Sequence, residues 1–365
     1  MQRVAHLAGV STSTVSRVVN EHPSVASETA AVVRKAMRQL SFSPAARRRW
    51  GSANGARSAG ATAIGFVVFG TSGSKTTPAF DNLLRGVSAA ANDNDLSLMF
   101  SFVSDPSQIP GRVLNRHVDG LLLHGERPGA AAQARFRALP TVWLMGNRQR
   151  PQWGDQVMPE NTVIGDLAAR YLIRRGHRSL GYVGTTGGSW SLPLRALAFE
   201  RSADDAGASV HSLIATEDRT ADLWDEDGLA SAADDIAAQF IELKNGARPS
   251  GLFVAEDRLL PAVSRALRGR GVSIGDVASG GADVEIVSCN NERPRVDGTL
   301  APPATIDIRA ESIGRRGVEQ LLWRMRNRDV PERIRVLVEP VLLEPGRQPS
   351  IDLEHVAANC GGATG

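Results

Sequence analysis

The stretch that decides the fold reads Leu7-Ala8-Gly9-Val10-Ser11-Thr12-Ser13-Thr14-Val15-Ser16-Arg17-Val18-Val19-Asn20. Gly9 tolerates the positive φ that a tight turn between two helices needs, and Val10 fills the angle between them. Ser11 stands where a helix N-cap is expected. Three valines of the second helix then fall at i, i+3 and i+4 and form one apolar stripe. The stretch therefore predicts a helix-turn-helix.

The second helix keeps its polar side chains outside the apolar stripe. These side chains belong to Thr12, Ser13, Ser16, Arg17 and Asn20. Hydroxyl groups can meet base edges or phosphates, Arg can bind guanine with two hydrogen bonds, and Asn can do the same with adenine. Such a face suits the major groove of double-stranded DNA. The residues alone also fit an ordinary helical hairpin with a Ser/Thr-rich face toward solvent.

The segment AGVSTSTVSRVVN resembles the DNA-reading element of the lactose-repressor (LacI/GalR) family of bacterial transcription regulators. The resemblance implies that bases are read by Thr12, Ser13 and Arg17. It also implies that phosphate contacts or helix caps come from Ser11, Thr14, Ser16 and Asn20. Family members usually begin with Thr and an aliphatic residue before the first helix, and Met1 takes the aliphatic place here. Either translation starts upstream, or the first helix lacks its N-cap at a cost of about 1 kcal/mol.

Charge separates a basic head from a mildly acidic body. Residues 1–60 contain nine Lys or Arg and two acids, a net charge of +7, so the rest of the chain sums to −4. This split indicates that only the head meets a polyanion. The sequence has no run of about eighteen apolar residues and no secretory signal, so no membrane partner is expected. Its two cysteines, Cys289 and Cys360, favour the reducing cytoplasm.

A third helix is expected to begin at Ser27-Glu28-Thr29 and to complete the all-α head, residues 1–44. Its apolar stripe would consist of Val32, Val33, Ala36, Met37 and Leu40. Pro44 ends the unit, because the residue before a proline disfavours the α region.

Residues 45–62 form a linker for which two interpretations stay open. The family resemblance implies a hinge helix that pushes an apolar side chain into the minor groove. Here Ala45 replaces the usual Asn and Gly51 falls at the usual Leu. Trp50 would be a displaced wedge with Arg47, Arg48 and Arg49 on phosphates, or the segment is a solvated tether.

Strands and helices alternate from Ala63 onward. Strands are expected at 63–69, 96–103, 118–123, 141–145, 179–183, 210–214, 251–254 and 285–289. Helices are expected at 82–93, 164–175, 194–206, 231–243 and 261–270. Repeated βα units imply parallel sheets covered by helices on both faces. The two series of units predict two α/β lobes.

Landmarks of the same family recur along this body. They are Val118-Asp119-Gly120, Gly176-His177-Arg178, Arg195, Ala255-Glu256-Asp257 and Pro303-Ala304-Thr305-Ile306. The resemblance implies two lobes of the periplasmic-binding-protein-like type, with the chain crossing between them near residues 159, 290 and 317. The first lobe would comprise 63–158 and 290–316, the second 159–289 and 317–348. Residues 349–365 form a tail without heptads, so no tetramer-forming helix is expected.

Ligands of open α/β sheets bind outside the carboxyl ends of the strands. The candidate ligand-binding residues are Ser72, Glu160, Ser191, Arg195, Trp224, Asp257 and Asn290. Arg195 matches the family Arg that holds a ligand hydroxyl or carboxylate, and a guanidinium suits either; a surface Arg is the alternative. Asn290 stands where the family commonly has Asp. The resemblance implies a sugar or sugar derivative, and Trp190 and Trp224 are candidates for stacking on its ring or for plain packing.

Enzyme chemistry finds little support in this sequence. The glycine-rich turn at 181–188 fits neither the dinucleotide fingerprint nor a P-loop, and no His pair has metal-ligand spacing. We therefore expect no catalytic residue, no cofactor and no metal.

The resulting hypothesis is a cytoplasmic repressor that binds a pseudo-palindromic operator as a homodimer and responds to a small-molecule effector. A constitutive DNA binder with a body that does not switch is one alternative. A cofactor-dependent enzyme with a basic head is a more remote one.

Overall fold

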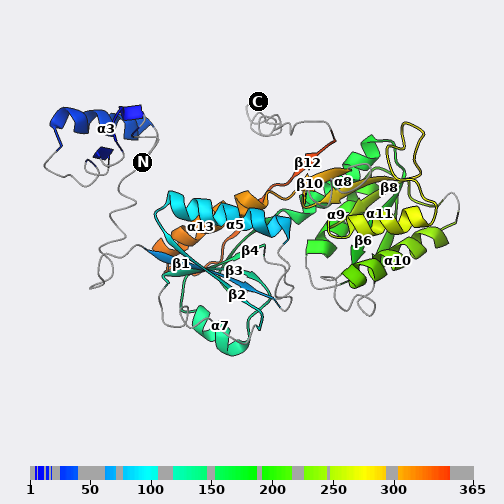
Figure 1. Ribbon diagram of the computed structural model, residues 1–365, viewed down its shortest axis with the longest axis horizontal. Helices are drawn as coiled ribbons and strands as arrows, with labels where there is room; N and C mark the ends of the chain where they lie inside the picture. The colour runs from blue at the N-terminus through cyan, green and yellow to red at the C-terminus, as the bar shows by residue number, and fades with distance from the viewer. Residues whose placement is uncertain are drawn as a thin grey trace, which may run out of the picture. The chain divides into compact units, whose positions relative to one another are not determined.

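A computed structural model of the chain (Figure 1) forms two compact units, Met1–Ala61 and Thr62–Gly365. The structure describes residues 5, 7–11, 14–15, 18, 25–39, 62–70, 77–105, 118–145, 153–186, 191–215, 226–244, 247–292 and 303–345. Expectations for the linker and for the tail lie outside these residues.

The head packs its helices around a small apolar core. This core contains Ala5, Val15, Val18, Ala30, Val33, Ala36 and Met37. Helix α3 (Ser27–Gln39) begins where the sequence predicted. Val32 was expected in its buried stripe, and this was wrong, because the side chain is 50% exposed. At about 100° per residue, position 32 lies roughly a quarter-turn or more away from the centre of the stripe.

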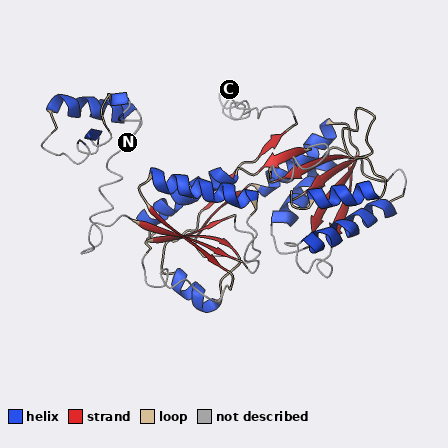
Figure 2. Cartoon of the chain, in the orientation of Figure 1, coloured by secondary structure: helices blue, strands red, loops and turns tan. Residues whose placement is uncertain are grey.

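The first lobe is a six-stranded parallel sheet in the order β11-β5-β4-β3-β1-β2. Its strands are β1 (Ala63–Phe69), β2 (Ser97–Val103), β3 (Gly120–Gly125), β4 (Thr141–Leu144), β5 (Asp155–Pro159) and β11 (Arg335–Val338). Helices α5 (Pro78–Asp93) and α13 (Ala310–Arg326) lie side by side on one face, and α7 (Ala130–Phe136) covers the other (Figure 2). A Cβ on Gly314 would stand 2.3 Å from the Leu83 carbonyl oxygen, so this close helix pairing requires glycine.

The second lobe is a six-stranded sheet in the order β12-β10-β9-β8-β6-β7. Its strands are β6 (Ser179–Thr185), β7 (Ser209–Ala215), β8 (Gly251–Val254), β9 (Glu285–Cys289), β10 (Ala304–Asp307) and β12 (Val341–Leu343). All neighbours pair in parallel except β10 and β12, which are antiparallel.

Helices cover both faces of this second sheet. They are α8 (Asn161–Arg174), α9 (Ser191–Asp205), α10 (Glu226–Glu242) and α11 (Leu260–Gly269). Successive strand residues point to opposite faces: Leu252 and Val254 of β8 pack in the core with α10 and α11. Between them in sequence, Phe253 packs against Phe199 of α9, with the ring centroids 5.4 Å apart and the rings tilted by 36°. The sheet is therefore the middle layer of three, as the βα pattern predicted.

The chain crosses from one sheet to the other close to one of the three positions predicted from the sequence. The other two crossings lie elsewhere than predicted. The first crossing follows β5 and precedes α8, close to the expected residue 159. The second lies between β10 and α13 rather than near 290, because β10 extends the second sheet by pairing with β9. The third lies between β11 and β12 rather than near 317, because β11 pairs with β5 of the first sheet. Residues 304–307 thus belong to the second lobe, and residues 310–338 to the first.

Candidate functional site

The helix-turn-helix is held by a local network around Ser11. Its hydroxyl accepts a hydrogen bond from the Thr14 amide at 3.1 Å, and its carbonyl accepts one from the Val15 amide at 3.1 Å. Gly9 has a φ of 64° in the turn. The Val10 amide closes that turn by donating to the Ala5 carbonyl at 3.0 Å. Ser11 therefore caps the second helix as predicted.

Buried valines fix which side of the second helix faces the head. Val15 and Val18 are both in the core of the head, which turns the opposite side of the helix away from it. The other residues expected at DNA lie outside the described part of the chain. They are Thr12, Ser13, Ser16, Arg17, Asn20, Arg47, Arg48, Arg49 and Trp50.

A second group of polar side chains gathers in the second lobe around Arg195. Strands β6, β8 and β9 run parallel, so their ends at Thr185, Val254 and Cys289 share one edge, the carboxyl edge of the second sheet. The Arg195 side chain reaches the residues that follow β8 and β9, and it is only 4% exposed. Its Nε donates to Asn161 Oδ1 at 3.0 Å, and its Nη1 donates to the Ala255 carbonyl at 2.5 Å. Nη1 and Nη2 also reach Asn290 Oδ1, at 3.5 and 3.4 Å.

Arg195 can reach these partners because α8 and α9 approach closely. A Cβ on Gly165 of α8 would stand 2.2 Å from the Arg195 carbonyl oxygen and 2.7 Å from the Phe199 amide. Only glycine permits this spacing, which brings the first turn of α9 beside the first residue of α8. There Asn161 is held by its own Nδ2, which donates to the Pro159 carbonyl at 3.2 Å.

The two carboxylates at this edge of the sheet, those of Glu256 and Asp257, contact groups other than Arg195. Asp257 Oδ2 accepts the Glu292 amide at 2.7 Å, and Glu256 pairs with Arg258 at 2.7 Å. Burial raises the pKa of Asp257 to about 7, although the hydrogen bond from the Glu292 amide opposes the shift. Among the described residues, Arg195 therefore contacts only amide oxygens of side chains and backbone.

Asn290 and Asn291 form an unusual turn directly after β9. Their φ angles are 112° and 55°, in a region that Asn adopts more readily than most residues. The Asn290 amide donates to the Ile306 carbonyl at 2.9 Å, and Asn291 Nδ2 donates to Asp307 Oδ2 at 3.1 Å. The turn is thus tied to β10, and it directs the Asn290 side chain at Arg195.

The candidate ligand residues from the sequence are only partly brought together. Arg195 and Asn290 are in contact, and Asp257 is buried at the same edge. Glu160 instead caps α8, accepting a hydrogen bond from the Thr162 amide at 3.2 Å, and Ser191 is the buried first residue of α9. Ser72 and Trp224 lie outside the described residues.

Asn161 and the Ala255 carbonyl were not among the ligand-binding residues predicted from the sequence. Asn161 follows Glu160, in the pair that aligns with the Asp-Asn common in the family, so a signal for it was present.

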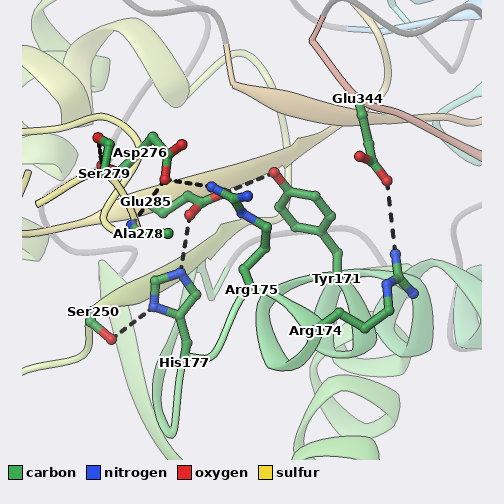
Figure 3. Close-up of polar contacts among 10 residues, drawn as sticks. All are labelled: Tyr171, Arg174, Arg175, His177, Ser250, Asp276, Ala278, Ser279, Glu285 and Glu344. Atoms are coloured by element: carbon green, nitrogen blue, oxygen red, sulfur yellow. Dashed lines mark hydrogen bonds and ion pairs between the residues drawn. The ribbon is translucent and has the colours of Figure 1, made fainter.

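A second polar cluster occupies the opposite edge of the same sheet, where β9 begins (Figure 3). Glu285 Oε1 accepts Tyr171 Oη and Arg175 Nε, both at 2.8 Å, and Oε2 lies 3.2 Å from His177 Nε2. Arg175 also pairs with Asp276 at 2.5 Å. A pocket of about 330 Å³ adjoins this cluster.

The charge of Glu285 is stabilised by these donors. Burial alone would raise the pKa of Glu285, but hydrogen bonds from His177, Arg175 and Tyr171 lower it to about 2. His177 continues the cluster to Ser250 Oγ at 2.8 Å, just before β8. His177, in the landmark Gly176-His177-Arg178, therefore links the end of α8 to the starts of β8 and β9 through its two ring nitrogens.

The part of the chain that the structure describes contains neither a cluster of metal ligands nor a helix that could span a membrane. No three His, Cys, Asp or Glu side chains gather there as metal ligands. No helix there combines the length and the apolar character that a membrane crossing needs.

Comparisons with known proteins cover both the head and the body. Residues 1–45 match the family of bacterial regulatory proteins of the lacI type, and residues 169–345 match a periplasmic binding protein-like domain. The ribose operon repressor of Escherichia coli is 27% identical over 360 residues, covering 95% of this chain and 98% of that protein.

Solved structures share the fold across the body or nearly the whole chain. A LacI family regulator from Enterococcus faecium with bound ribose has a TM-score of 0.59 at 18% identity, covering 78% of this chain and 97% of that one. The lac repressor dimer bound to operator and the anti-inducer ONPF has a TM-score of 0.59 at 20% identity, covering 93% and 96%. With its helix-turn-helix head and two α/β lobes, the chain belongs to the LacI family of bacterial transcriptional regulators.

Proposed function

We propose that the protein is a repressor that binds a pseudo-palindromic operator as a homodimer and changes its operator affinity when a small molecule binds beside Arg195. The observation that carries the proposal is the Ser11-capped helix of the head, in a segment that matches the lacI family at residues 1–45. The similarity to the ribose operon repressor over 95% of the chain supports control by a sugar or sugar derivative. The operator lies in the cytoplasm, which is where the protein would act.

A symmetric dimer fits this role because one reading helix covers only a half-site. The lac repressor, which shares the fold, binds its operator as a dimer. The effector would favour one arrangement of the two lobes, and the three crossing segments would carry that change toward the head.

Arg17 provides the test of the DNA-binding half of this proposal. A duplex selected by the wild-type protein from a random pool serves as operator in a gel-shift assay. Arg17→Ala should weaken specific binding about 10- to 100-fold, the value of a bidentate base contact. Arg170→Ala, at an exposed ion pair on α8, is the matched control and should leave binding unchanged. Equal operator affinity for Arg17→Ala and wild type would rule out the assignment.

Arg195 provides the test of the effector half. Arg195→Ala should keep operator binding and lose the change in affinity that wild type shows with sugars and sugar derivatives, measured by fluorescence anisotropy. A response that persists in Arg195→Ala would place the effector elsewhere. A wild-type protein that binds operator equally with every ligand tested would instead be a constitutive DNA binder.

A further inference from the structure

Arg195 is a buried cation with neutral partners among the residues described. Its guanidinium contacts Asn161, Ala255 and Asn290 through oxygen atoms that carry no formal charge. The two contacts to Asn290, at 3.4 and 3.5 Å, are also long for hydrogen bonds. Buried charges in proteins are normally paired, because removing an ion from water costs several kcal/mol. Among the described residues, no carboxylate therefore contacts the Arg195 guanidinium directly.

The neighbouring acids do not supply this contact. Glu256 is bound to Arg258 by two hydrogen bonds, at 2.9 and 2.7 Å. Asp257 is directed to the Glu292 amide, and its burial favours the neutral form of the carboxyl group. The Asn290 side chain lies within reach of both Nη atoms of Arg195, but its amide group carries no charge.

We propose that the effector carries a carboxylate, as a sugar acid does, and that this carboxylate binds the Nη atoms of Arg195. The inference rests on the effector-binding function proposed above and names its ligand class. A guanidinium binds a carboxylate through two parallel N–H···O bonds, which are roughly twice as strong as bonds between neutral groups. A neutral sugar would leave the guanidinium without a carboxylate in direct contact.

The first arm of the test compares matched ligands on the full-length protein. The pairs are ribose with ribonate, glucose with gluconate, and glucose with glucuronate, measured by thermal shift and by calorimetry. At least one acid should bind about tenfold or more tightly than its neutral partner, as a charged hydrogen bond implies. Arg195→Gln should abolish that preference.

The second arm needs no ligand. Asn290→Asp adds a carboxylate facing Arg195, and it should raise the melting temperature of the free protein by about 2–4 °C, the shift expected for roughly 1 kcal/mol. The same substitution in an Arg195→Gln background should give no gain. Asn290→Asp should also weaken binding of the preferred acid, because the new carboxylate competes for the same N–H groups.

The outcomes separate this inference from the proposed function. A neutral sugar that binds better than its acid and changes operator affinity overturns the inference while the proposed function stands. An acid that binds through Arg195 without any effect on operator affinity is not the effector, so it overturns both the effector role proposed for this site and the inference that rests on it. If no pair binds, the second arm decides: an Asn290→Asp protein no more stable than wild type overturns the inference, and a gain that depends on Arg195 supports it.

Discussion

Glu285→Gln should destabilise the second lobe by roughly 2 kcal/mol at neutral pH and by much less near pH 3. The substitution keeps the shape of the side chain and removes its charge from the cluster of Tyr171, Arg175 and His177 (Figure 3). The pKa of Glu285 falls from 4.5 to about 2 in the folded protein. At about 1.4 kcal/mol per unit, this shift corresponds to ~3 kcal/mol. Arg175 is 33% exposed, so solvent screening reduces the figure.

The sign of the pH dependence follows from the direction of the shift. A carboxyl group with a lower pKa in the folded than in the unfolded chain stabilises the fold fully above the unfolded value. That contribution is lost as the pH falls from 4.5 toward 2. The gap in stability between wild type and Glu285→Gln should therefore be constant above about pH 5 and shrink below it.

Urea unfolding followed by circular dichroism at several values between about pH 3 and pH 7 measures this gap. Glu344→Gln is the matched control, because Glu344 pairs with Arg174 at 3.9 Å where Arg174 is 59% exposed. Its loss should stay below about 1 kcal/mol, as for most surface ion pairs. A gap that is equally large at both ends of the pH range, or a Glu344→Gln loss as large as that of Glu285→Gln, would refute the reasoning.

Two further substitutions test how the Arg195 site is built. Gly165→Ala should cost about 1–3 kcal/mol and weaken ligand binding, because its Cβ would stand 2.2 Å from the Arg195 carbonyl oxygen; Gly269→Ala, with no atom within 4 Å of its Cβ, is the control. Equal melting temperatures for these two variants would contradict the close-approach argument. Asp257→Asn should gain stability relative to wild type as the pH rises from 3.8 to about 7, because the raised pKa makes the wild-type carboxyl group costly to ionise in the fold. A difference in unfolding free energy that stays constant across that range would show that Asp257 is not held in its neutral form.

The central strands could be predicted from sequence because they are buried on both faces and read as continuous apolar runs. Strands β8 and β9 begin and end at the predicted residues. Helix α5 begins four residues before the predicted 82, because Thr77 caps it and Pro78 fits its first turn. The sequence did not correctly predict to which lobe residues 304–307 belong. A four-residue strand has no pattern that chooses between two sheets, and its place is decided by pairing with β9.

The partners of Arg195 were harder to predict from the sequence than the strands. Which groups contact a charged side chain depends on the folded structure and not on residue types alone. The family resemblance led to Arg195 and marked Asn290 as a departure from the usual Asp. It pointed to Asn161 only as the partner of Glu160 in a family pair, and the contact of Asn161 with Arg195 exists because Gly165 lets α9 approach α8. The sequence also places Glu256 and Asp257 near the site, and two acids would suggest that Arg195 is already neutralised. The structure shows one acid bound to Arg258 and the other directed at a backbone amide, so neither carboxylate contacts the guanidinium in the way that an Asp at position 290 would.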